Sequence, residues 1–141
     1  MNDKVVDHFQ SIDPTLFFLT QKVSIEIPSS RKPSDYFVSL CREIIGQQLS
    51  GKVADVIFAR FEQLFSGSNI SPQTLLKFSE DTLRTTGMSW SKARSLRDLA
   101  EKVSSKFVQL SQLAKFSDDE VVRELTRVKG IGPWTAEMFL I

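Results

Sequence analysis

Two glycines near the end of the chain have the spacing of a turn that binds a phosphate. Gly130 and Gly132 enclose Ile131 and precede Pro133, a residue suited to the first position of a helix. Glycine places no side chain between the backbone and an approaching group. Free amides at such a turn, with the positive end of the helix dipole, bind an anionic oxygen like those of a nucleic-acid backbone. An ordinary helix–glycine–helix connection is the alternative interpretation.

The distribution of charge is more informative than its total. The chain of 141 residues has a formal net charge of only +1, which does not indicate a nucleic-acid binder. Lys129 adds a positive charge beside the glycines, and the stretch from Arg84 to Phe107 holds six cationic residues against two acidic ones. A local basic face attracts a nucleic-acid backbone. A solvated helix face is an equally good interpretation of any one of these residues: Arg84, Lys92, Arg94, Arg97, Lys102 and Lys106.

The elements that carry these residues are predicted to be helices, which gives an all-α fold. Start signals lie at Asp13-Pro14, at Ser71-Pro72 and at Ser117 with Glu120, and Gly87 is expected to end a helix that holds Leu75 to Leu83. Gly46 to Gly51 predicts a break between two helices. Residues 23–28 are predicted as a short extended piece and residues 29–33 as a linker. Three apolar stripes have helical spacing: Phe37, Leu40, Cys41, Ile44 and Ile45; Val53, Val56, Ile57, Phe61, Leu64 and Phe65; and Leu96, Leu99, Ala100, Val103 and Phe107.

Cysteine usage and hydropathy predict an intracellular, soluble protein. Cys41 is the only cysteine and lies on an apolar stripe, so a buried, reduced thiol is expected. There is no apolar run long enough to cross a bilayer, and the first residues do not form a signal peptide. No membrane partner is therefore expected.

Three motifs in order resemble one family of DNA repair enzymes. Residues 128–138 resemble the hairpin Gly-Ile-Gly-x-Trp-Thr-Ala of the helix-hairpin-helix DNA glycosylase superfamily, in its alkylpurine or 3-methyladenine DNA glycosylase II branch. Residues 44–50 resemble the Gln-Gln-[Ile/Leu]-Ser segment of that branch, and residues 87–93 its Gly-x-Ser-x-x-Lys-Ala helix. The resemblance implies an all-α helix-hairpin-helix glycosylase fold, incomplete at the C-terminus. Residues 1–35 are then an N-terminal helix and connecting segment, and residues 36–141 a truncated helix-hairpin-helix domain.

The resemblance also implies a function and a set of site residues. It implies base-excision repair by a monofunctional N-glycosylase that flips alkylated purines such as 3-methyladenine out of double-stranded DNA and hydrolyses them from the sugar, without metal or small-molecule cofactor. Gln48 and Leu49 are expected to fill the gap left by the flipped base. The alternative, which the residues alone favour, is that Gln47 and Gln48 are exposed polar residues and that Leu49 belongs to the core. Trp134 and Met138 are expected to line the base pocket. Plain packing of an amphipathic helix is the alternative for both, and the residues alone favour it for Met138. The expected DNA-binding hairpin residues are Lys129, Gly130, Ile131, Gly132 and Thr135.

The resemblance assigns no catalytic residue to this chain. Bifunctional members of the superfamily have a lysine where this chain has Trp134, so hydrolysis to an abasic site is implied. The catalytic aspartate is expected beyond Ile141, and Asp118, Asp119 and Glu137 do not match its position. The chain as given is therefore expected to lack the general base. A non-catalytic helix-hairpin-helix module that binds DNA or senses lesions, and an all-helical interaction domain, are the alternative hypotheses.

Overall fold

The structure is a computed structural model that describes residues 3–23 and 32–140. No strand occurs in these ranges, and the all-α prediction is confirmed. Contacts divide the chain into two units, Met1–Ser30 and Arg31–Ile141, a division slightly before the boundary expected at residue 35. Most of the predicted extended piece and linker lies outside the described residues, although Pro33 already starts a 3-10 turn. No helix in the described ranges is long and apolar enough to cross a membrane.

The first unit is a pair of short helices, α1 (Asp3–Ile12) and α2 (Pro14–Lys22). Asp13 begins α2 as predicted, because its carboxylate accepts hydrogen bonds from the amides of Thr15 and Leu16 at 3.0 Å each. The helix ends at Lys22, directly before the extended piece predicted from residue 23.

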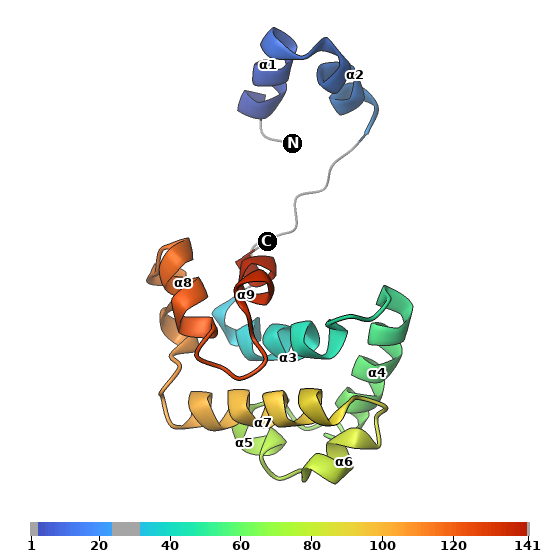
Figure 1. The fold of residues 1–141 in the computed structure, drawn as a ribbon, viewed down its shortest axis with the longest axis vertical. Coiled ribbons are helices and arrows are strands. Elements are labelled where there is room, and N and C mark those ends of the chain that lie inside the picture. The colour runs from blue at the N-terminus through green and yellow to red at the C-terminus, as the bar shows by residue number, and fades with distance from the viewer. Residues whose placement is uncertain (1–2, 24–31, 141) are drawn as a thin grey trace. The chain divides into compact units, whose positions relative to one another are not determined.

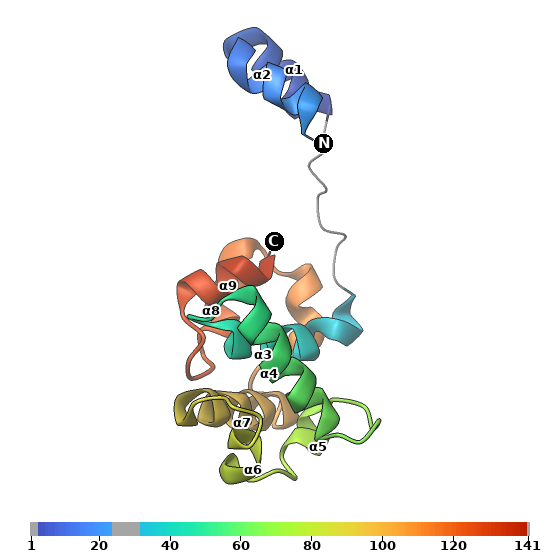
Figure 2. The same ribbon diagram turned by 90° about the vertical axis from the view of Figure 1, so that its right-hand side faces the viewer.

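The second unit is built around one central helix. Figures 1 and 2 both show α3 between α7 on one side and α9 on the other, and α3 packs against each of them. Helices α5 and α6 pack against α7, and α8 packs against α9. The elements of this unit, in order, are η1 (Pro33–Asp35), α3 (Tyr36–Gly46), α4 (Gly51–Gln63), α5 (Pro72–Leu75), α6 (Glu80–Arg84), α7 (Trp90–Ser104), η2 (Leu110–Lys115), α8 (Asp118–Leu125) and α9 (Pro133–Leu140).

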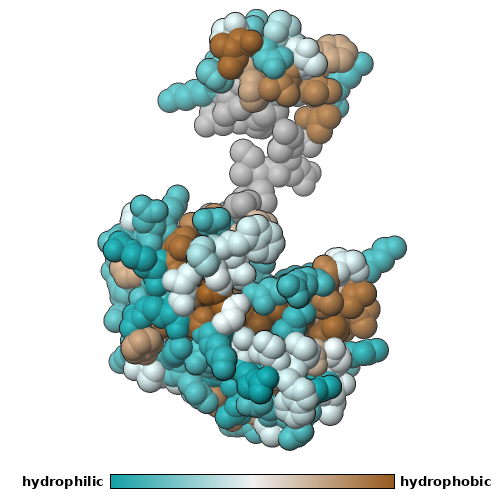
Figure 3. Space-filling model, viewed as in Figure 1, coloured by the Kyte–Doolittle hydropathy of each residue, from teal (hydrophilic) through white to brown (hydrophobic). Residues whose placement is uncertain are grey.

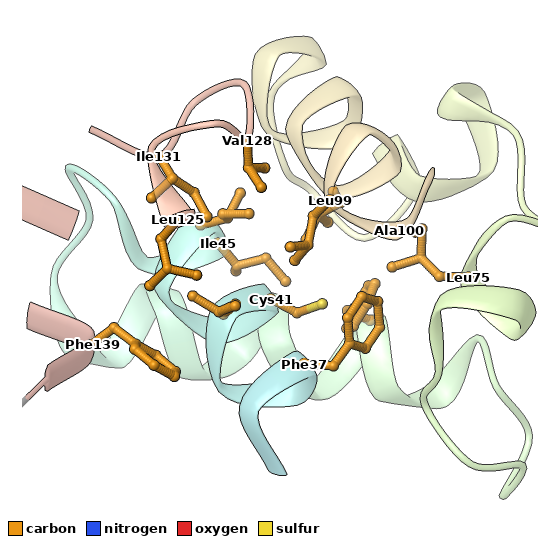
Figure 4. Packing of buried hydrophobic residues seen from close by; sticks show 14 of the residues in the cluster. Phe37, Cys41, Ile45, Leu75, Leu99, Ala100, Leu125, Val128, Ile131 and Phe139 are labelled. Carbon is orange, nitrogen blue, oxygen red and sulfur yellow. The ribbon is translucent and has the colours of Figure 1, made fainter. Parts of the chain in front are cut away.

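The core of the second unit forms on the stripe predicted for α3. All five residues of that stripe are buried. Figure 4 shows Cys41 and Ile45 between side chains of α7 and side chains from the segment that leads into α9. The buried thiol of Cys41 is confirmed, and desolvation raises the pKa of that thiol far above its ordinary value. The core therefore fixes α3, and with it the turn that follows α3.

The stripe predicted along α4 is partly wrong. Its buried residues are Ile57, Phe58 and Phe61, whereas Val53 is 47% and Val56 51% exposed. Phe58 belongs to the buried row because it lies beside Ile57 and three residues before Phe61, whereas both valines occupy the neighbouring row. The surface coloured as hydrophobic over α4 in Figure 3 agrees with this exposure.

The helix predicted from Leu75 to Leu83 is in fact two helices. Helix α5 ends at Leu75 and α6 begins at Glu80. The hydroxyl of Ser79 accepts a hydrogen bond from the Thr82 amide at 3.1 Å, and this cap starts the second helix. Gly87 follows α6 in the left-handed region, with φ +101°, which agrees with its predicted role as a helix stop.

The stripe predicted along α7 ends earlier than expected. Leu96, Leu99 and Ala100 are buried, but Phe107 is 50% exposed. The chain leaves the helix at Ser104, and Lys106 adopts φ +59°, so Phe107 no longer continues the helical row. Its ring instead lies 3.8 Å from the guanidinium carbon of Arg127.

Candidate nucleic-acid interface

The segment that joins α8 to α9 is held in place by α7. Helix α8 starts at the capping box predicted for Ser117 and Glu120, in which the Ser117 amide donates to the Glu120 carboxylate at 2.8 Å and lowers the pKa of that carboxyl group. Further along, Asp98 accepts from the Lys129 amide at 2.7 Å. Lys102 donates to Asp98 at 2.8 Å and to the Arg127 carbonyl at 2.6 Å. One ion pair of α7 thus anchors the backbone just before the glycines.

The two glycines of the hairpin serve different purposes. Gly130 has φ +86°, and a Cβ at this position would lie 2.2 Å from the hydroxyl oxygen of Ser95. It is therefore required for packing against α7. Gly132 does not adopt the left-handed conformation of Gly130, and a Cβ at Gly132 would meet no atom within 4 Å. The bare backbone of Gly132 faces the exterior, where an approaching group can reach it.

The free amides of the hairpin belong to the glycines and not to the residue between them. Within the described part of the chain, the amides of Gly130 and Gly132 have no hydrogen-bond acceptor. The first bond of α9 runs from the Ala136 amide to the Gly132 carbonyl at 3.0 Å, so the Gly132 amide lies at the positive end of α9. Ile131 was expected to contribute a free amide, and this is wrong. Its amide donates to the Val128 carbonyl at 3.1 Å, and its side chain is buried.

A second exposed feature lies at the break between α3 and α4. As predicted, the helix stops between Gly46 and Gly51. Gln47 has φ −48° and ψ 129°, Gln48 has φ +57°, and the Leu49 amide donates to the Gly46 carbonyl at 3.1 Å. This is a type II β-turn, whose third position usually holds glycine. Gln48 occupies that position with an exposed side chain, and Leu49 leans half-buried on the core.

The backbone of Gln48 costs stability, and a substitution tests this. Gln48→Gly is expected to raise the free energy of unfolding by about 1 kcal/mol, because glycine adopts the left-handed region without the Cβ conflict. Urea denaturation would measure it. Gln63→Gly, at the end of α4, removes the same exposed side chain from a right-handed position and is not expected to stabilise. A Gln48→Gly protein less stable than the parent would contradict the prediction.

Gln47 joins the corner to the hairpin. Its side-chain amide donates to the Gly130 carbonyl at 2.8 Å and to the Thr135 hydroxyl at 3.1 Å. Thr135 was expected among the DNA-binding hairpin residues, but it is only 6% exposed and its hydroxyl oxygen accepts this bond. The structure therefore places Thr135 inside the junction and not on the surface that DNA would meet.

A cavity of about 340 Å³ opens between the corner and the first turn of α9. Trp134 borders it and is 67% exposed, so plain core packing does not account for this indole. Met138 is half-buried and does not line this cavity, which agrees with plain helix packing and not with a place in the pocket beside Trp134. The cavity thus borders both the corner and the first turn of α9, which directly follows the hairpin. The lining residues are Arg42, Glu43, Gly46, Gln47, Gln48, Leu49, Gly51, Ala54, Asp55, Trp134 and Thr135.

Four of these residues were missed at the level of the sequence. Gln47, Arg42, Glu43 and Asp55 line the cavity, and Arg42 forms an ion pair with Asp55. Their positions in the sequence, close to the helix break, could have indicated that they line the cavity. Arg42 and Glu43 lie about one helical turn before the corner, and Asp55 lies one turn after Gly51. One helical turn advances only about 5.4 Å, so residues one turn from a helix break lie close to the surface of that break.

Much of the predicted basic face is used inside the protein. Lys92 donates to the Ile45 and Gln47 carbonyls at 2.8 Å each, and desolvation lowers the pKa of its amine. Arg97 donates to the Phe78 carbonyl, and Lys102 holds Asp98. Arg94 remains exposed. The stretch therefore presents fewer free cations than its composition suggests.

Comparison with known families agrees with this arrangement. Residues 41–139 match the model of the HhH-GPD superfamily base excision DNA repair proteins. The chain belongs to this superfamily. The matched range begins in α3 and ends in α9, so it contains the corner, the hairpin and the cavity between them.

Two curated relatives of this HhH-GPD protein are DNA-3-methyladenine glycosylases. It is 33% identical to a DNA-3-methyladenine glycosylase of Saccharomyces cerevisiae, over 96% of this chain and 50% of the yeast protein. It is 31% identical to DNA-3-methyladenine glycosylase 1 of Schizosaccharomyces pombe, over 95% of this chain and 60% of that protein. The chain thus spans about half of the length of these relatives.

Solved structures share the HhH-GPD fold. A Schizosaccharomyces pombe 3-methyladenine DNA glycosylase in complex with abasic DNA superposes with a TM-score of 0.81 at 31% identity, covering 97% of this chain and 68% of that one. A DNA-3-methyladenine glycosidase from Bacillus halodurans superposes with a TM-score of 0.76 at 36% identity, covering 92% of this chain and 59% of that one. The helix-hairpin-helix glycosylase fold predicted from the sequence is confirmed.

Proposed function

We propose that this chain carries the DNA-gripping, gap-filling and base-recognition surfaces of a monofunctional glycosylase that removes alkylated purines such as 3-methyladenine. The observation that carries the proposal is the proximity of three features: the free amides at Gly130 and Gly132, the corner at Gln48, and the cavity beside Trp134. Base excision from a duplex requires a backbone grip, a gap filler and a base pocket. The relatives described as 3-methyladenine glycosylases support it. Such a protein acts inside the cell, where genomic DNA is found.

The cavity suits a cationic base. Alkylation of a purine ring nitrogen makes the base positively charged, and an exposed indole face attracts such a cation. Trp134 is 67% exposed at the border of the cavity, so its ring is accessible to such a base. A neutral purine would gain little from this attraction, so the indole favours damaged over normal bases.

The proposed reaction is hydrolysis. The bond from sugar C1′ to the base nitrogen breaks, its electron pair leaves with the cationic base, and water adds at C1′ with loss of a proton. Trp134 offers no amine for covalent attack on the sugar, so no strand cleavage follows. We assign no residue of this chain to the carboxylate that would stabilise the cationic sugar. Because no residue is assigned to this carboxylate, a second candidate function remains, that of a non-catalytic helix-hairpin-helix module that binds damaged DNA.

Two measurements test the proposal. The protein should bind a duplex with a tetrahydrofuran abasic site more tightly than the intact duplex, as fluorescence anisotropy would show. Incubation with methylated DNA, followed by chromatography of released bases, distinguishes the two candidates. Release of 3-methyladenine supports the glycosylase, and abasic-site binding without release supports the non-catalytic module. A folded protein that binds neither duplex would overturn both.

Trp134→Ala isolates the role of the indole. The probe is a duplex with 2′-fluoro-7-methylguanine, in which the fluorine on the sugar prevents release of the cationic base. We expect this duplex to bind about 30-fold more weakly, because a desolvated cation–π contact contributes about 2 kcal/mol. The intact duplex should bind almost as before. Trp90→Ala is the matched control, since Trp90 is also exposed but does not line the cavity. Equal losses for the cationic and the intact duplex would count against base recognition by Trp134.

A further inference from the structure

We propose that Gln47 is a positioning residue that sets the distance between the gap-filling corner and the phosphate-binding hairpin. The inference rests on the proposed function and deepens it. Gln47 belongs neither to the free amides of the hairpin nor to the residues expected to enter DNA. Its role follows from the two elements that its side chain connects.

The side chain of Gln47 bridges segments far apart in the sequence. Both of its amide contacts, to the Gly130 carbonyl and to the Thr135 hydroxyl, fall on the hairpin side, at the turn and in the first turn of α9. A neutral amide group carries two hydrogens, so these two acceptors use its full donor capacity. The carbonyl of Gly130 is thereby held next to the amides that are proposed to grip phosphate.

The backbone of Gln47 is fixed from the opposite side. The ammonium group of Lys92 on α7 donates to the carbonyls of Ile45 and Gln47, which are end groups of α3 without partners within that helix. Hydrogen bonds from a charged donor are about twice as strong as neutral ones. The first central position of the type II turn is therefore held rigidly, and Gln48 follows it directly.

Helix α7 completes the link. Besides holding the corner through Lys92, it supports the hairpin through Ser95, which faces Gly130, and through Asp98, which accepts from the Lys129 amide. Corner and hairpin thus share one support, and Gln47 is the direct tie between them. Because a duplex has fixed spacing between a phosphate and a base step, a fixed distance between these two protein elements lets both engage at once.

Gln47→Glu and Gln47→Leu test the inference. Glutamate is nearly isosteric but places acceptors against the Gly130 carbonyl, and leucine removes the tie without adding charge. The readout is the fluorescence of 2-aminopurine opposite a tetrahydrofuran site, which reports entry of a side chain into the gap, beside anisotropy for total binding. We expect loss of most of the fluorescence change at protein concentrations where anisotropy shows that the duplex is fully bound, so that any change in total binding is accounted for. Gln63→Leu is the control, because it replaces an exposed glutamine on α4 with the same residue.

A double-mutant cycle separates positioning from mere stability. If Gln47 acts through Gln48, then Gln48→Ala should reduce the fluorescence change in the parent but add little in the Gln47→Leu background. Additive losses, or a Gln47→Leu protein that behaves as Gln63→Leu does, would overturn the inference. A parent protein that binds no abasic duplex would instead refute the proposed function, so the two failures are distinguishable.

Discussion

Gly132→Arg is expected to remove most duplex binding from a protein that remains folded. A Cβ at Gly132 would meet no atom of the protein within 4 Å, so the side chain can leave the backbone without a clash, but it would occupy the position from which a phosphate reaches the amide. Hydrogen bonds to a charged group contribute about 1.5–3 kcal/mol, so the loss should be roughly 10- to 100-fold. The added positive charge would by itself strengthen binding to DNA, which makes a loss especially informative.

The measurement is anisotropy of a labelled abasic duplex at low and moderate salt, with circular dichroism as the check on folding. Ser111→Arg, at an exposed position on η2, is the control for the added charge and should bind at least as well as the parent. Should Gly132→Arg bind as the control does, the hairpin would not be the phosphate grip, and the proposed function would lose its central support.

Gly130→Ala should destabilise the fold instead. A methyl group would lie 2.2 Å from the hydroxyl oxygen of Ser95 and 2.9 Å from its Cβ, and alanine would also have to adopt φ +86°. The left-handed conformation costs roughly 1–2 kcal/mol and overpacking roughly 1–3 kcal/mol, so we expect a total of about 3 kcal/mol in urea denaturation. The Ser95 hydroxyl cannot simply turn away, because its Cβ is also too close.

Two further variants separate the steric contribution to this loss of stability from the contribution of backbone strain. Gly132→Ala should change the free energy of unfolding by less than about 0.5 kcal/mol, because no special feature surrounds that position. Ser95→Gly in the Gly130→Ala background removes the steric conflict but leaves the backbone strain, so it should restore part of the lost stability. A Gly130→Ala protein as stable as the parent would refute the packing role of Gly130.

The sequence predicted the hairpin well because its signals are local. Glycine, proline and capping residues act through their own backbone, and so the break at Gly46 to Gly51 and the starts at Ser71 and Ser117 were confirmed. The two glycines of one motif could not be distinguished, because the need for Gly130 comes from Ser95, which lies on another helix.

The interior of the site depends on contacts between segments distant in sequence, and these were missed. The sequence around Gln47 does not indicate that its side-chain amide reaches residues 83 and 88 positions away. Lys92 was assigned to a basic face because a lysine on an amphipathic helix usually points to solvent, whereas here it caps α3. Val53 and Val56 were assigned to the core because their apolar character does not tell which of two neighbouring rows is covered.

The dual support that α7 provides has a consequence for local unfolding. A segment opens on its own only when few native contacts hold it to its surroundings. The corner and the hairpin both depend on side chains of α7 between Lys92 and Lys102, so transient fraying of that helix releases them together. The two elements therefore form one cooperative unit, and amide exchange in either should report the opening of the other.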